Sequence, residues 1–389
     1  PEFYADESWG PRLDGRMVAQ WDAFTPGTET YGQMRPWDAN PDNVNDFFEQ
    51  GVFVNNSLNI GKAGENYNIN ATITNSNRGG VLPNSDQKRT FLNLNTRINL
   101  SERLEMTAMA NYSRTYTKGN LFEGYNSVAS NFNQWFQRQL DMSLLEKYYR
   151  MPDGRYTSWN INSARNSTPL YWNSPYTEMY GNFSENNEET VSAKFGLAYE
   201  IIEGLTVAAN LNRYYKTGWA TGRTASGTLD QDAFSTSSYE RTEDNYEFIA
   251  QYNRTWENFS LETIAGGNIR RNETKSWSQS TSGGLSVPDL YNISASVDRP
   301  NTSNYFSERH VNSVFAEANV GYNGIIFLRA SIRRDWDSAL PESSNAFTYP
   351  AVSTSFVFSE LLNSQDIISF GKLRLSYAEV GGELAPYAL

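Results

Sequence analysis

The chain has 389 residues, with 44 acidic and 32 basic side chains and a formal net charge of −12. This acidic balance argues against nucleic acid as a partner, because phosphate binding requires a basic face. The sequence has no cysteine and one histidine, which excludes thiol catalysis, disulfide bonds and a zinc site of cysteine and histidine ligands. Mean hydropathy is −0.62, and no window approaches the roughly 20 apolar residues of a membrane helix. A helical membrane protein is therefore excluded, and we expect no metal and no cofactor.

From residue 51 onward, apolar and polar residues alternate strictly in segments of about ten. One such segment places Leu92, Leu94 and Ile98 on one parity and Asn93, Asn95, Arg97 and Asn99 on the other. Successive side chains of a strand point to opposite faces, so each segment has one dry and one wet face. This pattern is typical of a transmembrane β-barrel, in which lipid covers the dry face and water the wet one. A soluble sandwich can show the same alternation, so the connections must distinguish the two.

The predicted strands number about twelve and form six tight pairs. In chain order the pairs are 52–60 with 67–74, 91–100 with 104–116, 191–201 with 205–215, 246–256 with 259–271, 311–322 with 325–333, and 347–358 with 370–378. Between the pairs lie long links, which we place at about 76–89, 118–188, 217–244, 274–308 and 335–346. An order of short and long links gathers every tight turn at one end of the sheet. Outer-membrane barrels have this asymmetry, with short periplasmic turns and long extracellular loops. The sequence thus predicts an all-β fold, a transmembrane antiparallel β-barrel with long extracellular loops, over residues 51–389.

Aromatic side chains make up 14% of the chain, and several tyrosines and tryptophans stand near the predicted strand ends. Amphipathic rings gather at the headgroup level of membranes, which favours two aromatic girdles. Tyrosine is also simply a good strand former, so this feature alone does not decide the matter.

The link at 118–188 is the richest candidate for a functional surface. Long structureless loops are uncommon and are usually functional or disordered. Aromatic faces stack on sugar rings and anchor protein interfaces, so we expect contact with substrate or partner from Trp135, Phe136, Tyr148, Tyr149, Tyr156, Trp159, Tyr171, Trp172 and Tyr176. The alternative is that these rings form a small core of the loop itself. Residues 139–149 are expected to form a short helix that seats the loop.

Catalytic chemistry is poorly represented in the sequence. Asp335 and Asp337 flank Trp336, and paired carboxylates beside an aromatic ring can indicate glycoside hydrolysis. A solvated, turn-forming strand end explains them equally simply. His310 is expected to be an ordinary polar residue at a strand edge, and a Ser–His–Asp set would need a better-placed histidine. We therefore expect a protein that is not an enzyme and has no catalytic residues.

Four blocks of residues resemble a known family, in the right order along the chain. The first reads SWGPRLDG at 8–15 and QWD at 20–22, and the second reads DNVNDFFEQG at 42–51 and NNSL at 55–58. The third reads RRDWDSALP at 333–341, YPAVS at 349–353 and FVFSEL at 356–361, and the fourth KLRLSYA at 372–378 and VG at 380–381. Together they resemble SusC/RagA-type TonB-dependent transporters, the outer-membrane nutrient importers of Bacteroidetes.

The resemblance implies a multi-pass outer-membrane barrel of 22 strands with a plug, of which this chain would supply an internal segment. Residues 1–50 would be an extracellular loop region that leads into the barrel, and the plug domain, the TonB box and the last strands would lie outside the chain. The implied function is TonB-dependent uptake of a bulky nutrient, an oligosaccharide or a peptide. The implied partners are a SusD-like surface lipoprotein, the TonB complex and outer-membrane lipid.

A rival hypothesis from another class is a soluble extracellular carbohydrate-binding or adhesive β-protein without a transport role. It would share the alternation and the aromatic loops, and its solubility would distinguish it from a barrel.

Overall fold

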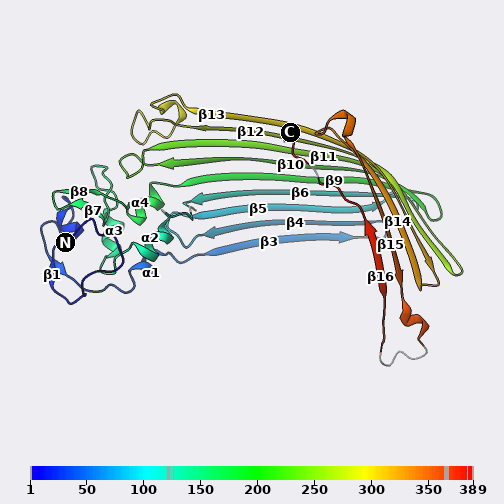
Figure 1. The fold of residues 1–389 in the computed structure, drawn as a ribbon, viewed down its shortest axis with the longest axis horizontal. Helices are drawn as coiled ribbons and strands as arrows, with labels where there is room; N and C mark the ends of the chain where they lie inside the picture. Colours follow the sequence, from blue (N-terminus) through cyan, green and yellow to red (C-terminus); the bar gives the residue numbers. More distant parts are fainter. Residues whose placement is uncertain (1, 121–122, 126, 363–367, 383, 388–389) are drawn as a thin grey trace.

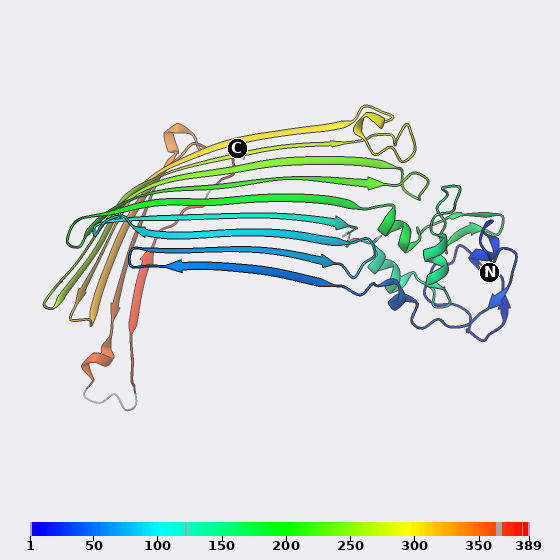
Figure 2. The same cartoon turned by 180° about the vertical axis from the view of Figure 1, so that it is seen from behind.

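The computed structural model describes residues 2–120, 123–125, 127–362, 368–382 and 384–387. Twelve antiparallel strands form one curved sheet, and a small domain lies beyond one end of it (Figures 1 and 2). The strands follow one another across the sheet in chain order, from β3 to β16, and one of the two segments of the small domain lies between β6 and β9 in the sequence. Among the described residues the two edge strands β3 and β16 do not pair, so the sheet is open. The prediction of about twelve antiparallel strands is confirmed.

All six predicted strand pairs are present as hairpins. The strands are β3 (Phe53–Ala63), β4 (Tyr67–Gly79), β5 (Asp86–Asn99), β6 (Leu104–Gly119), β9 (Ser184–Ile202), β10 (Leu205–Thr224), β11 (Ala233–Trp256), β12 (Phe259–Ser280), β13 (Asn301–Tyr322), β14 (Ile326–Asp337), β15 (Ala346–Phe356) and β16 (Leu373–Ala378). The short helices η2 (Ile293–Ala295), η3 (Glu342–Ser344) and η4 (Phe358–Leu361) lie in the connections.

The strands are longer than the alternation predicts, at the end nearest the small domain. β11 has 24 residues, whereas the pattern marked only 246–256. The predicted long links at 76–89, 217–244, 274–308 and 335–346 are therefore wrong in extent, because the strands leave only 80–85, 225–232, 281–300 and 338–345 between them. The added strand carries polar residues on both faces, as in Ser235–Asp244 of β11, so the ladder continues where the alternation has ended.

One face of the sheet is apolar and exposed. The strand register places in one row across β6, β9, β10, β11 and β12 the side chains of Ala108, Phe195, Leu211, Tyr246 and Ile269. Phe248, one strand position further along this face, is 56% exposed. Contiguous exposed apolar surface of this extent is rare on soluble monomers. Along β11 this face carries Tyr246, Phe248, Ala250 and Tyr252 and ends with Arg254 and Trp256, over about 33 Å of strand, or about 25 Å of thickness at the usual barrel tilt.

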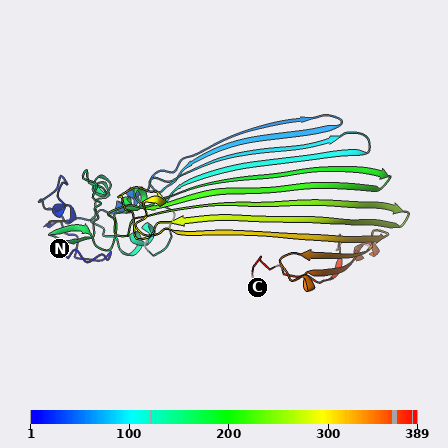
Figure 3. The same cartoon turned by 90° about the horizontal axis from the view of Figure 1, so that it is seen from above.

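The opposite face is polar. Its rows include one that contains Asn95, Met109, Lys194, Asn212, Asn245 and Arg270. These side chains bond to one another, for example Asn59 Nδ2 to Thr72 Oγ1 at 2.7 Å and Asn210 Nδ2 to Glu247 Oε1 at 3.0 Å. Seen from above, the sheet curves, and β14–β16 turn away from the plane of the first strands (Figure 3). The alternation thus yields the predicted dry and wet faces of a curved wall.

The small domain, which we call the cap, combines residues 2–50 with the described part of 120–182. Its elements are β1 (Met17–Val18), η1 (Trp21–Phe24), β2 (Arg35–Pro36), α1 (Asn43–Phe47), α2 (Val128–Gln134), α3 (Met142–Tyr148), β7 (Ile161–Ser163), β8 (Asn166–Pro169) and α4 (Pro175–Tyr180). The predicted helix within 139–149 is confirmed as α3. Residues 121, 122 and 126 of the predicted long loop lie outside the described residues. No helix in the described part of the chain is both long and apolar enough to cross a membrane.

Candidate functional site

The cap has its own hydrophobic core, built from two segments far apart in the sequence. Trp21 and Phe47 of the first segment pack with residues of the second, namely Val128, Phe136, Leu140, Met142, Leu144, Leu145, Tyr148, Met151, Trp159, Ile161, Trp172, Tyr176 and Met179. The ring of Phe47 lies 5.0 Å from Phe132 and 5.2 Å from Tyr176, in edge-to-face contacts. Residues 2–50 are therefore one half of a folded domain, rather than only a loop that leads into the sheet.

Five of the nine predicted contact residues belong to this core, and a sixth, Tyr156, is buried outside it. Phe136, Tyr148, Tyr156, Trp159, Trp172 and Tyr176 are buried. Trp135 and Tyr149 are half-buried, and Tyr171 is 59% exposed. The alternative that the rings form a core of the loop thus describes most of them. Contact with substrate or partner stays a prediction, and in this structure Tyr171 offers the largest free ring surface of the nine.

Polar contacts hold the two segments of the cap together. The Nδ2 atom of Asn43 donates to the carbonyl oxygens of Gln137 at 3.0 Å and Leu140 at 3.2 Å. Trp172 Nε1 donates to Asp6 Oδ2 at 2.7 Å. Within the first segment, Arg35 forms a two-bond ion pair with the fully buried Asp22, at 2.6 and 2.9 Å. A buried carboxylate needs such a partner, because an unpaired buried charge is strongly destabilising.

An acidic side chain of α4 bonds to the residues on either side of the helix. Glu178 accepts hydrogen bonds from Asn173 Nδ2 at 2.7 Å and from Asn182 Nδ2 at 3.1 Å. Burial nevertheless raises the pKa of the Glu178 carboxyl, because desolvation of the charged form outweighs the two amide donors. Burial also raises the pKa of the neighbouring Tyr176 hydroxyl.

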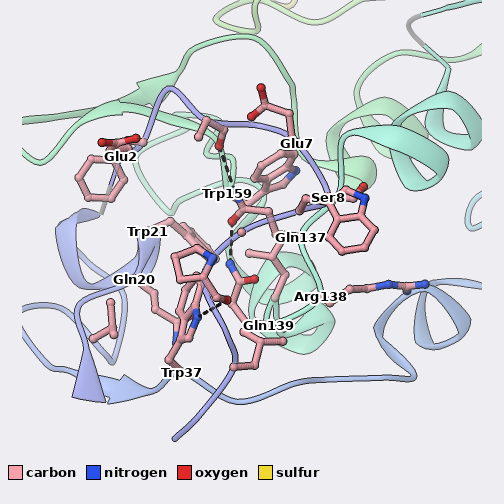
Figure 4. A pocket seen from close by; sticks show the side chains of 18 of the residues that line it. Glu2, Glu7, Ser8, Gln20, Trp21, Trp37, Gln137, Arg138, Gln139 and Trp159 are labelled. Carbon is pink, nitrogen blue, oxygen red and sulfur yellow. Dashed lines mark hydrogen bonds between the residues drawn. The ribbon is translucent and has the colours of Figure 1, made fainter. Parts of the chain in front are cut away.

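A cavity of about 830 Å³ opens in the cap between the first segment and the turn before α3 (Figure 4). Residues 8–14, which we call the arch, form one wall, and the Ser8 amide N–H fixes its start on the Gln134 carbonyl oxygen at 3.1 Å. Four of the ten tryptophans line the cavity, namely Trp9, Trp21, Trp37 and Trp159. Trp9, on the arch, is 92% exposed.

The side chains that line the cavity include three amides, and two of these form a hydrogen-bonded chain. Gln137 Nε2 donates to the Ala5 carbonyl oxygen at 3.0 Å, and Gln139 Nε2 donates to Gln137 Oε1 at 2.6 Å, as the dashed lines of Figure 4 show. This chain fixes the orientation of both side chains. It leaves Gln139 Oε1 without a hydrogen-bond partner among the residues that the structure describes. An acceptor is therefore available at the cavity.

This cavity was not predicted from the sequence, in which Trp9 and Trp21 belong only to the blocks that resemble the transporter family. A signal was present, since three of the ten tryptophans fall within residues 9–37. The amides of Gln137 and Gln139 carried no such signal, because their role depends on the contact with Ala5, more than 130 positions away.

The carboxylates considered for catalysis are paired with arginines. Asp337 accepts from Arg309 Nε at 2.9 Å and also from its Nη2, and Asp335 accepts from Arg333 Nε at 2.8 Å. His310 lies within β13, exposed, with Nε2 2.8 Å from Glu308 Oε1. These contacts are those of polar residues near the ends of long strands.

The chain resembles known proteins in structure rather than in sequence. No protein-family model matches it, and no curated protein matches its sequence. The structure of the RagAB peptide transporter matches with a TM-score of 0.68 and 14% identity over 88% of this chain, and the RagAB peptide importer in its open-open state with 0.66 and 14% over 87%. The closed form of the ferric-catecholate import receptor Fiu from E. coli K12 matches with 0.51 and 9% over 85%.

The likeness establishes the fold, that of a transmembrane antiparallel β-barrel wall, and it agrees with the exposed apolar face and the meander of the sheet. These similar structures are a transporter, an importer and an import receptor, and not enzymes. The chain spans 38% of the length of the RagAB chain that it matches, and 49% of the Fiu chain.

Proposed function

We propose that the chain forms part of an outer-membrane importer of the SusC/RagA type, which takes up a bulky nutrient and depends on TonB for energy. The observation that carries this proposal is the pairing of one exposed apolar face with one polar face along the same strands. Lipid solvates the first face and the lumen of a closed barrel hydrates the second. In water, the exposed apolar face of such a sheet would be unfavourably hydrated. In the wall of a membrane barrel, lipid covers that face.

The polar face supports transport rather than anchoring alone. A cavity of about 430 Å³ lies on it, lined by residues that include Asn70, Asn95, Arg97, Thr107 and Lys194. Polar and charged side chains toward the lumen allow a hydrated solute, or a hydrated plug, to lie against the wall. Peptide import by RagAB, whose structure is similar to that of this chain, supports a peptide as one class of cargo, and the ring-rich cap supports an oligosaccharide as the other.

A surface lipoprotein of the SusD type is the proposed partner at the cap end. The exposed rings of the cap include Trp9, Tyr125 and Tyr171, which are its three most exposed rings apart from Tyr4. Exposed aromatic side chains are typical anchors of protein interfaces. The proposal that the TonB complex supplies the energy rests only on the four sequence blocks that resemble the family.

Cell fractionation of the full-length protein tests the membrane assignment. We expect it in the outer-membrane fraction, to be extracted only with detergent, and to migrate faster on gels before boiling than after it. Recovery in the soluble fraction would instead favour the rival hypothesis of an extracellular carbohydrate-binding or adhesive protein. Loss of growth on one class of nutrient after deletion of the gene, restored by the intact gene, is expected for the importer.

The partner is tested separately by replacing Trp9, Tyr125 and Tyr171 together with serine. We expect the variant barrel to assemble, since none of the three rings is buried, and to lose the lipoprotein on affinity purification. Unchanged co-purification would remove the cap from the partner interface.

A further inference from the structure

The geometry points to the cavity behind the arch as a binding site for a short, neutral oligosaccharide. This inference deepens the proposed function by choosing between its two classes of cargo, and it rests on the cap being part of an importer. The site is defined by residues that include Trp9, Arg12, Trp21, Trp37, Gln139 and Trp159.

The size of the cavity suits a ligand of a few sugar units. Pockets of roughly 300–1,000 Å³ enclose most of the surface of a small ligand, and about 830 Å³ lies in the upper part of that range. Two hydrogen bonds anchor the segments that form the walls. Gln137 Nε2 donates to the Ala5 carbonyl oxygen at 3.0 Å, and the Ser8 amide N–H donates to the Gln134 carbonyl oxygen at 3.1 Å. The cavity is therefore formed by packed parts of the cap.

The indole rings supply the apolar part of the site. Sugar rings carry C–H groups on one face, and aromatic faces pack against them. Trp9 is free to do so, since 92% of its surface is exposed on the arch. Trp37 is held in place, because its Nε1 atom donates to the Pro11 carbonyl oxygen at 3.4 Å. One exposed ring and one ring held by a hydrogen bond thus line the same cavity.

The charges around the cavity cancel, which disfavours an anionic or cationic ligand. Arg12, Arg16 and Arg138 line it together with Glu2 and Glu7. Arg16 is bound to Asp14 through Nε at 2.7 Å and through Nη2, and this contact lowers the pKa of the Asp14 carboxyl to about 2. Asp14 is therefore charged at all ordinary pH values and neutralises Arg16.

The amide chain supplies directional contacts for hydroxyl groups. Gln139 Oε1 is free to accept, within the described part of the chain, and the orientation of its amide is fixed by its bond to Gln137. A hydroxyl both donates and accepts, so it matches a surface that mixes amide oxygens and N–H groups. A charged peptide terminus would find no surplus charge here.

The test is ligand binding by the full-length protein, purified in detergent and followed by intrinsic tryptophan fluorescence and calorimetry. The neutral probes are maltotriose, mannotriose, xylotriose and chitotriose. Tri-galacturonic acid is the acidic probe, and tetra-alanine amide is the peptide probe. We expect at least one neutral trisaccharide to bind at or below about 1 mM.

Three variants locate the site. Trp9→Ala is expected to weaken binding about tenfold through lost stacking, and Gln139→Leu about fivefold through one lost hydrogen bond. Tyr31→Ala is the matched control, a 55% exposed cap ring that does not line the cavity, and it should leave the affinity unchanged. Circular dichroism and the fluorescence melting curve check that each variant is folded.

Four outcomes would overturn the inference. They are no binding of any neutral trisaccharide at about 10 mM, preferential binding of the acidic or peptide probe, binding that Trp9→Ala leaves intact, and an equal loss of binding from the control Tyr31→Ala. Failure here with the protein still in the outer membrane would leave the importer proposal standing. A water-soluble protein that binds a trisaccharide through Trp9 would remove the importer and keep the site.

Discussion

In the sheet, each strand pairs with the next one along the chain, and the connections at one end are as short as Glu257–Asn258. In the cap, Asn43 bonds to Gln137 and Phe47 packs on Tyr176, across more than ninety positions. The sheet also exposes its large apolar side chains, such as Phe248, whereas the cap buries its own, such as Phe136. The two regions differ because they face different solvents: the sheet needs lipid to cover one face, and the cap must form a core in water.

The largest effect is expected when a large side chain of the cap core is replaced by alanine. Phe47 is 1% exposed, and Phe47→Ala should cost the cap about 3–5 kcal/mol, since it leaves a cavity among Phe132 and Tyr176. Hydrogen exchange of the full-length protein in detergent should show faster exchange in 17–47 and 128–180 and no change in the strands. Phe48→Ala, at a 44% exposed ring, is the control and should have a small effect. Equal loss of protection in the sheet would show that the two regions unfold as one unit.

A charge on the apolar face of the sheet is expected to act next most strongly. Leu94→Arg or Phe195→Arg should cost about 2–4 kcal/mol near the middle of the membrane, and reduce the amount of heat-modifiable protein in the outer membrane. Asn95→Arg, on the polar face one residue away, should be tolerated. Comparable damage from both faces of β5 would contradict the assignment of one face to lipid.

The cap core and the apolar face of the sheet differ in how far the sequence predicts them. The strand pairs and both faces of the sheet could be predicted, because a period of two is a local pattern. The extensions of β10–β13 could not, because both of their faces meet water and the period disappears. The cap was foreseen only as the short helix near Leu144 and Leu145 and as a possible ring core. The packing of Trp21 and Phe47 against the second segment of the cap depends on contacts between distant parts of the chain. A local periodic pattern does not predict such contacts.

A smaller effect is expected at the start of α3. Asp141 Oδ1 accepts from the Ser143 amide N–H at 3.0 Å, which caps the helix. Asp141→Ala should cost about 1 kcal/mol, and Asp141→Asn should cost almost nothing, since asparagine caps equally well. The measurement is the tryptophan-fluorescence melting temperature of the cap. A loss with asparagine equal to that with alanine would assign the effect to the charge instead of the cap.

The smallest effect is a dependence of cap stability on pH. The raised pKa of Glu178 means that the folded cap binds this proton more tightly than the unfolded chain. The stabilisation that this proton gives is complete below pH 4.5, the pKa of the carboxyl in the unfolded chain. It is lost as the pH rises through the higher pKa of the folded cap. The melting temperature of the cap should thus fall as pH rises above about 4.5. Glu178→Gln, which does not titrate, should flatten this slope, and an unchanged slope would assign it to other groups.

The long strands that extend beyond the apolar face have a consequence for the binding of other molecules at that end of the sheet. In β11 the segment from Ala233 to Asn245 extends the ladder by about 40 Å past Tyr246, paired on both sides with β10 and β12. Backbone that is already held in a ladder has little conformational entropy left to lose. A molecule that docks on these extensions meets a prearranged surface, so its affinity is reduced less by ordering than it would be on loose loops. The free energy of binding at this surface therefore depends mainly on the contacts made there and little on rearrangement of the chain.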